Sequence, residues 1–217
     1  MALKRQPVAN KTSSNTEYTN LPEGEHEGRL TYVADLGVQE RKYEGDVQPP
    51  CQQISLGIEI IGQTTTIDGS EVPRLLWSKP INLFQTMTEK GSEYLIYKQF
   101  NSSAKVGTIA DWESVIGLPC NVVVKHNVRG DRTYDDVNSI NAIPTKYRDK
   151  VADGVLTDGC VGDVDDEENP AQKAMYGLPR WKFERRLLCG LPLKSTDTKL
   201  RSVPTPNDEK FDKDIPF

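Results

Sequence analysis

The feature that most constrains the fold is a strict alternation of apolar and polar residues between positions 53 and 60. The apolar residues of this stretch are Ile54, Leu56, Ile58 and Ile60. Successive side chains of a β-strand point to opposite faces, so a period of two predicts a strand with one buried and one solvated face. A strand of this kind needs paired neighbours, which predicts a β-rich fold.

Similar patterns elsewhere predict four more strands. In the first of them, one face carries the apolar residues Leu30, Tyr32, Ala34 and Leu36. After the strand at 54–60, an Asp68-Gly69 turn predicts a hairpin. The predicted strands span residues 28–36, 54–60, 72–77, 121–127 and 133–143. The connecting segments predict a loop over 37–50, a loop and short helix over 84–100, and a brief helix over 109–116.

Three strands, a short helix and a closing hairpin form the order expected of a five-stranded OB-fold barrel, in which each strand buries one face. We therefore expect an all-β fold with minor helices: a five-stranded OB-fold barrel with an insertion and disordered tails. The expected organisation is a flexible arm over 1–22, a domain over 23–200 and a disordered acidic tail over 201–217. Within the domain, the barrel occupies about 26–143 and an extension follows over 144–200.

The net charge of −5 does not exclude a nucleic-acid partner, because the acidic residues are unevenly distributed. Residues 153–168 carry seven acids and no base, and residues 208–217 carry four acids against two lysines. The rest of the chain has 25 basic and 21 acidic residues, a net charge of +4. This charge distribution permits DNA binding without requiring it.

The sequence predicts a soluble, cytoplasmic protein without cofactor, metal or disulfide. It contains no apolar run of membrane-spanning length, and its first residues lack the apolar stretch of an export signal. The four cysteines are widely spaced and form no close metal-binding pair. We interpret them as small buried hydrophobic residues. They are Cys51, Cys120, Cys160 and Cys189.

Three clusters combine cations with aromatic rings, the two side-chain types that hold single-stranded nucleic acid. The first cluster lies in the loop that follows the strand at 28–36. The second lies on the strand at 72–77, where Trp77 serves either the core or base stacking. The third cluster flanks the last hairpin. A solvated loop or turn explains the first and the third cluster alone about equally well, but the three clusters together favour a binding groove. Their residues, with Arg29 of the first strand, are Arg29, Arg41, Lys42, Tyr43, Arg74, Trp77, Lys79, Lys125, Arg129, Arg132 and Tyr134.

Two stretches carry a family resemblance. Residues 29–39 (RLTYVADLGVQ), followed by the 42–45 loop (KYEG), resemble the N-terminal half of tailed-phage single-stranded DNA-binding proteins with an OB fold. Residues 112–120 (WESVIGLPC) and the hairpin after them resemble the second half of the same barrel. The resemblance implies a protein that coats single-stranded DNA without sequence specificity in phage DNA replication, recombination and repair, in the cytoplasm of the host cell.

The end of the chain is more distinctive. Residues 212–217 (DKDIPF) resemble the acidic C-terminal tip of bacterial single-stranded DNA-binding proteins, although Lys213 interrupts the acidic run. The resemblance implies that this tip recruits replication and repair proteins. The partner-binding residues it implies are Asp212, Asp214, Ile215, Pro216 and Phe217.

Two alternatives remain from other functional classes. The acidic run at 163–168 could supply the carboxylates of a two-metal nuclease. It lies among Gly154, Gly159, Gly162 and Pro170, however, which favours a solvated loop over a rigid metal site and makes an enzyme the weaker hypothesis. The other alternative is a replication adaptor that displays the tail and does not itself bind DNA.

Overall fold

Seven strands make up most of the structure, a computed structural model that describes residues 19–67, 69–156 and 159–163. Two short α-helices and one turn of 3-10 helix accompany them, so the prediction of an all-β fold with minor helices is confirmed. The elements are β1 (Gly24–Tyr43), β2 (Asp46–Ile67), β3 (Ser70–Trp77), β4 (Ile81–Leu83), α1 (Ser92–Phe100), η1 (Glu113–Val115), β5 (Pro119–Arg129), β6 (Arg132–Ala142), α2 (Thr145–Arg148) and β7 (Cys160–Asp163).

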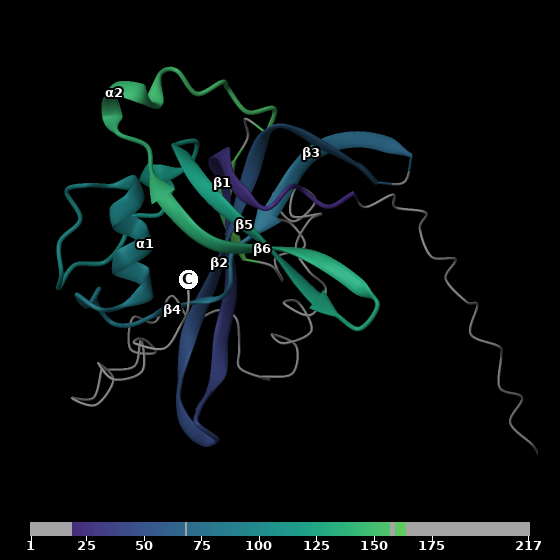
Figure 1. Ribbon diagram of the computed structural model, residues 1–217. Helices are drawn as coiled ribbons and strands as arrows, with labels where there is room; N and C mark the ends of the chain where they lie inside the picture. The colour runs from purple at the N-terminus through teal and green to yellow at the C-terminus, as the bar shows by residue number, and fades with distance from the viewer. Residues whose placement is uncertain (1–18, 68, 157–158, 164–217) are drawn as a thin grey trace, which may run out of the picture.

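The strands form one sheet in the order β3-β2-β1-β5-β6, with β4 added to β2 and β7 added to β1. β7 runs parallel to β1, and the other strand pairs are antiparallel. The sheet curves strongly (Figure 1), which brings β3 and β6, the two ends of this order, close together. Arg74 of β3 and Asp135 of β6 form an ion pair there, with Nη2 and Oδ2 2.6 Å apart and the two side chains only 3% and 0% exposed.

Three hairpins project from the core as arms (Figure 1): β1–β2, β2–β3 and β5–β6. The hairpin predicted at Asp68-Gly69 is confirmed, since β2 ends at Ile67 and pairs there with Ser70. The loop predicted over 37–50 is wrong, because both strands continue through it to a turn at Glu44 and Gly45. Both turn residues have positive φ, 49° and 94°, as a tight two-residue hairpin turn requires.

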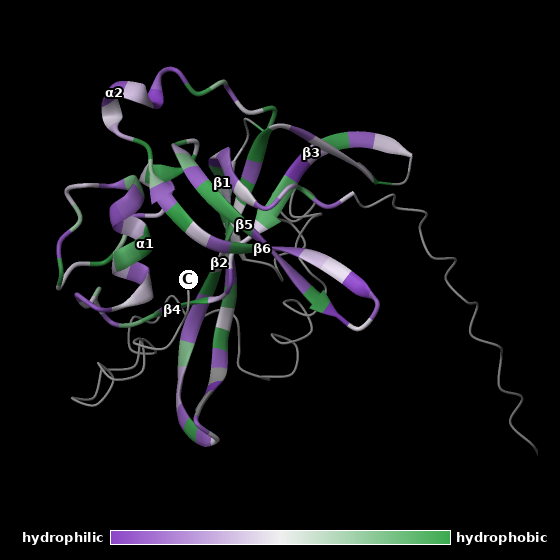
Figure 2. Cartoon of the chain, in the orientation of Figure 1, coloured by the Kyte–Doolittle hydropathy of each residue, from purple (hydrophilic) through white to green (hydrophobic). Residues whose placement is uncertain are grey.

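The core lies inside the curved sheet and is closed on one side by α1 and η1. The predicted apolar row of β2 faces it, with Ile54, Leu56, Ile58 and Ile60 all buried in one cluster with Val122 and Val124 of β5. Trp112 packs edge-on against Tyr97 of α1, with their ring centroids 5.1 Å apart. Figure 2 shows hydrophobic residues concentrated where β1, β2, β5 and β6 cross.

The prediction that β1 carries one continuous apolar face is wrong. A register shift between Leu30 and Tyr32 leaves Thr31 as an extra residue. A bulge of this kind reverses the side-chain alternation after it. Leu30 therefore joins the core, whereas Tyr32 and Ala34 point to the opposite side of the sheet.

The expectation that each strand buries one face is also wrong. The face of β1, β2 and β3 that points away from the core, called here the outer face, is buried as well. Its apolar members lie outside the core cluster, and all but Trp77, which is half-buried, are 0–8% exposed. On these strands they are Tyr32, Ala34, Leu36, Cys51, Leu75 and Trp77, and Phe84, which follows β4, is likewise buried outside the core cluster.

The segment after α2 is attached to the outer face by its backbone. The Arg29 guanidinium donates hydrogen bonds to the carbonyl oxygens of Val151 and Ala152, both at 2.9 Å. Its cross-strand neighbour Glu59 accepts the N–H groups of Val155 and Leu156 at 2.6 and 2.9 Å. The chain then forms β7, which pairs with the edge of β1 at residues 32–35.

The end of the predicted N-terminal arm is anchored. Asn20 Nδ2 and the backbone N–H of Leu21 donate to the Asp135 carboxylate at 2.9 and 3.0 Å, and the Leu21 side chain is buried. Both histidines hold the same segment, because His26 and His126 donate to the carbonyl oxygens of Pro22 and Leu21, each at 2.8 Å. In the described part of the chain, neither helix has the length and apolar character needed to cross a membrane.

Candidate nucleic-acid interface

The β5–β6 hairpin brings four of the predicted binding residues to one face. In its register, Lys125 pairs with Asp136, Asn127 with Tyr134, and Arg129 with Arg132. Directly opposite residues of an antiparallel pair point to the same side, as do alternate residues of one strand. Lys125, Arg129, Arg132 and Tyr134 therefore share one face with Asn127 and Asp136. This set of six residues is called the hairpin face below.

The hairpin face is cationic and carries an accessible ring. The hairpin face contains three cationic side chains, all exposed, and one carboxylate, that of Asp136. The Arg129 guanidinium lies 5.9 Å from the centre of the Tyr134 ring, which is 39% exposed. Asp136 is partly neutralised, since it accepts a hydrogen bond from Asn127 at 2.8 Å and lies 3.9 Å from Arg129. The face can therefore offer charge to phosphates and a ring to a base.

The opposite face of this hairpin fixes its position. Asp135 points inward and receives hydrogen bonds from Arg74, Asn20 and Leu21. His126 Nε2 lies 3.6 Å from Oδ1 of the same carboxylate. Because this cluster anchors the base of the hairpin to β3, the hairpin face stands on a supported element.

The first-loop cluster lies on a different arm. Arg41 is in β1, only 9% exposed, with its guanidinium 5.1 Å from the centre of the Phe84 ring. Lys42 and Tyr43 end β1 directly before the turn, and their side chains lie outside the described set. The β1–β2 and β5–β6 arms leave the core in different directions (Figure 1), so these clusters do not form one continuous patch.

The other predicted cations and Trp77 have different surroundings. Arg29 and Arg74 are engaged with the backbone and with Asp135 as described above. Trp77 stacks on Tyr32 of the outer face, with the ring centroids 6.4 Å apart and the planes 19° apart. It therefore lies on the opposite side of the sheet from the core, half-buried, and Lys79 follows it as an exposed residue.

The remaining predicted sites fall largely outside the described residues. The tip at 212–217 and residues 164–168 of the acidic run both lie outside them. The backbone of Asp163 is part of β7, but its side chain is not among those that the structure describes. Among the residues that are described, no group of three His, Cys, Asp or Glu side chains is placed to hold a metal ion.

The interpretation of the cysteines as buried hydrophobic residues holds for two of them, because Cys51 and Cys120 are fully buried. Burial raises the pKa of the Cys120 thiol to about 12. Cys160 in β7 is only partly buried, and burial raises the pKa of its thiol as well. Cys189 lies outside the described residues.

The sequence reasoning overlooked two members of the hairpin face, Asn127 and Asp136. A signal for Asn127 was present, because Lys125, Asn127 and Arg129 occupy alternate positions of one predicted strand. Asp136 could not be placed in this way, since it reaches the face only through the pairing of β5 with β6.

No protein-family model matches this chain, and a search of curated proteins finds no match for it.

Proposed function

We propose that this protein binds single-stranded DNA without sequence specificity and that the hairpin face is its principal contact surface. The observation that carries the proposal is the gathering of Lys125, Arg129, Arg132 and Tyr134 on one face of β5–β6. Cations along a strand attract phosphates, and an exposed ring stacks on any base, so the combination suits sequence-tolerant binding.

We further propose that the curved sheet is an OB-type barrel. Three features support this assignment: the long β1–β2–β3 meander, the position of α1 between β4 and β5, and the approach of β3 to β6 through Arg74 and Asp135. OB folds hold oligonucleotides with the loop between their first two strands and the loop between their last two. On this assignment the β1–β2 arm, with Lys42 and Tyr43 at its end, is a second contact.

The C-terminal tip is proposed to recruit replication and repair proteins. This part of the proposal rests on the sequence at 212–217, with its acidic residues and terminal Phe217. Such a segment offers an apolar anchor beside negative charge, which suits a small basic pocket on a partner. The phage replication context likewise rests on the sequence resemblance.

The test is a fluorescence-anisotropy titration of the full chain with labelled oligo-dT and with a duplex of equal length, at several salt concentrations. We expect preference for the single strand and a log–log salt slope of about −0.7 for each contacted phosphate. Tyr134→Ala should weaken binding by about 1–3 kcal/mol. Replacing Lys125, Arg129 and Arg132 with Ala should make the slope shallower by about 2.

The matched control is a second cation–ring cluster on α2. Lys146 Nζ lies 4.7 Å from the centre of the Tyr147 ring, which is 44% exposed. Lys146→Ala/Tyr147→Ala should leave affinity unchanged. If the wild-type protein binds duplex and single strand equally, the proposal is wrong. If it binds neither, the adaptor hypothesis replaces it, whereas loss of the oligonucleotide in the presence of Mg²⁺ would indicate the nuclease.

A further inference from the structure

The outer face presents an unusual combination of burial and position. It belongs to three strands of the sheet and points away from the core, yet Tyr32, Ala34, Leu36, Leu75 and Phe84 are as buried there as core residues. Removing apolar side chains from water is favourable by about 25 cal/mol per Å², so a broad apolar sheet face is stable only when it is covered.

The centre of this face is formed by small residues. Ala34 and Ser55 are cross-strand neighbours, and Gly57 lies beside them in β2, where the Trp77 ring covers it. The middle of the outer face therefore carries small residues, with the Trp77 ring packed over one of them. In addition, Gln53 Oε1 is buried on this face without a hydrogen-bond donor among the described residues, so a segment lying over it could supply one.

Nucleic acid does not suit the outer face. The described arginines of β1 and β3 are engaged: Arg29 with backbone carbonyls, Arg74 with Asp135, and Arg41 over Phe84. β2 contributes no lysine or arginine at all. A DNA strand placed here would meet few cations for its phosphates, whereas an apolar peptide segment would gain buried area.

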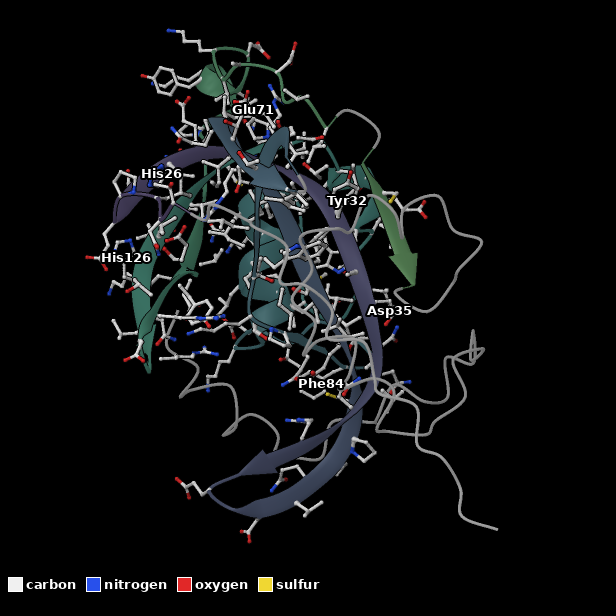
Figure 3. The ribbon with its side chains drawn as sticks, turned by 90° about the vertical axis from the view of Figure 1, so that its right-hand side faces the viewer. His26, Tyr32, Asp35, Glu71, Phe84 and His126 are labelled. Carbon is white, nitrogen blue, oxygen red and sulfur yellow. The ribbon has the colours of Figure 1, made fainter. Side chains whose placement is uncertain are left out.

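We propose that residues 175–188 of the same chain cover the outer face. These residues combine rings and aliphatic side chains at close spacing, including Met175, Tyr176, Trp181, Phe183 and Leu187. They follow β7, which lies on the edge of this face beside Tyr32 and Asp35 (Figure 3). The inference is independent of DNA binding.

The chain length between β7 and this segment allows the arrangement. Residues 164–174 can span up to about 36 Å when extended. The distance from β7 across β1 and β2 to β3 is three strand spacings, roughly 15 Å. The linker therefore reaches any point across the face from the end of β7.

Photo-crosslinking in the full chain tests the proposal. The residue at position 77 is replaced by p-benzoylphenylalanine, an aromatic substitute for Trp77, and the dilute protein is irradiated without DNA. Mass spectrometry should identify crosslinks to residues 175–188 within the monomer. The same photoreactive residue at position 134, on the hairpin face, is the control and should give none to that segment. Crosslinks to a second copy would overturn the proposal, as would crosslinks formed only with added oligo-dT.

A second measurement uses two native thiols and no photoreactive residue. Cys51 lies on the outer side of β2 at 0% exposure, and Cys120 lies in the core. In the full-chain variant Trp181→Ala/Phe183→Ala, alkylation of Cys51 should accelerate at least tenfold while Cys120 stays protected. An unchanged rate at Cys51 would refute the inference. If both thiols accelerate together, the variant has unfolded and the crosslinking result decides.

Discussion

Replacing Asp135 with Asn should be among the most damaging single changes in the described structure. The Asp135 side chain is 0% exposed and accepts hydrogen bonds from Arg74 at 2.6 Å, Asn20 at 2.9 Å and Leu21 at 3.0 Å. Asn preserves the shape but removes the charge, which leaves the Arg74 guanidinium buried without its carboxylate. Breaking one partner of a buried ion pair costs about 3–5 kcal/mol.

The size of this effect can be measured as a change in Tm and by urea unfolding. For a chain of this length, each kcal/mol shifts Tm by about 2–4 °C, so a fall of roughly 6–20 °C is expected. Asp136→Asn is the matched control, because it removes the same charge one residue away on the exposed hairpin face. Its ion pair with Arg129, at 3.9 Å and 31% exposure of the carboxylate, should contribute about 1 kcal/mol or less.

Adding Arg74→Met to Asp135→Asn should cost less than the sum of the two single changes, since the second removes the uncompensated charge. Equal Tm values for the Asp135→Asn and Asp136→Asn variants would refute the view that this pair joins the two ends of the sheet.

Three further predictions follow from particular contacts. Gly57→Ala should destabilise the protein by about 1–3 kcal/mol and alter the fluorescence of Trp77, because the new Cβ would lie 2.9 Å from Trp77 Cη2; an unchanged Tm and spectrum would contradict this. In the native protein at pH 8, iodoacetamide should modify Cys160 much faster than Cys120, because a thiol pKa of about 12 leaves Cys120 with almost no thiolate. Equal modification rates would show that Cys120 is accessible. Gly154→Ala should lower Tm and increase the rate of amide hydrogen exchange at Val155 and Leu156, because a Cβ at position 154 would collide with the Glu59 carboxylate. Exchange at the wild-type rate would refute this contact.

The sequence predicted the features that depend on local pattern. The alternation from Ile54 to Ile60 placed the core face of β2 correctly, and Asp68-Gly69 placed the β2–β3 hairpin. β4 and β7 are three and four residues long, too short for a periodic signal, and they exist because β2 and β1 offer open edges. The bulge at Thr31 could not be read from the pattern, because it depends on pairing with β2.

The same distinction between local pattern and distant pairing applies to the candidate site. Lys125, Arg129, Arg132 and Tyr134 come from one hairpin, so their common face follows from local spacing. The surroundings of Arg29 and Arg74 depend on distant residues, because Ala152 and Asp135 lie 123 and 61 positions away in the sequence. Nothing local distinguishes an arginine that binds a phosphate from one that holds the fold.

The pairing of Arg29 and Glu59 with the 151–156 segment has a consequence for how this chain can diverge. These two side chains bind mainly peptide groups, the carbonyls of Val151 and Ala152 and the N–H groups of Val155 and Leu156. Every residue except proline offers both groups, so most side chains of the segment can be exchanged without loss of the attachment. Gly154 is one exception, because its missing Cβ makes room for the carboxylate, and the buried Val151 is another. Related chains could therefore share this architecture while retaining little more than an arginine, a glutamate and a glycine at widely separated positions.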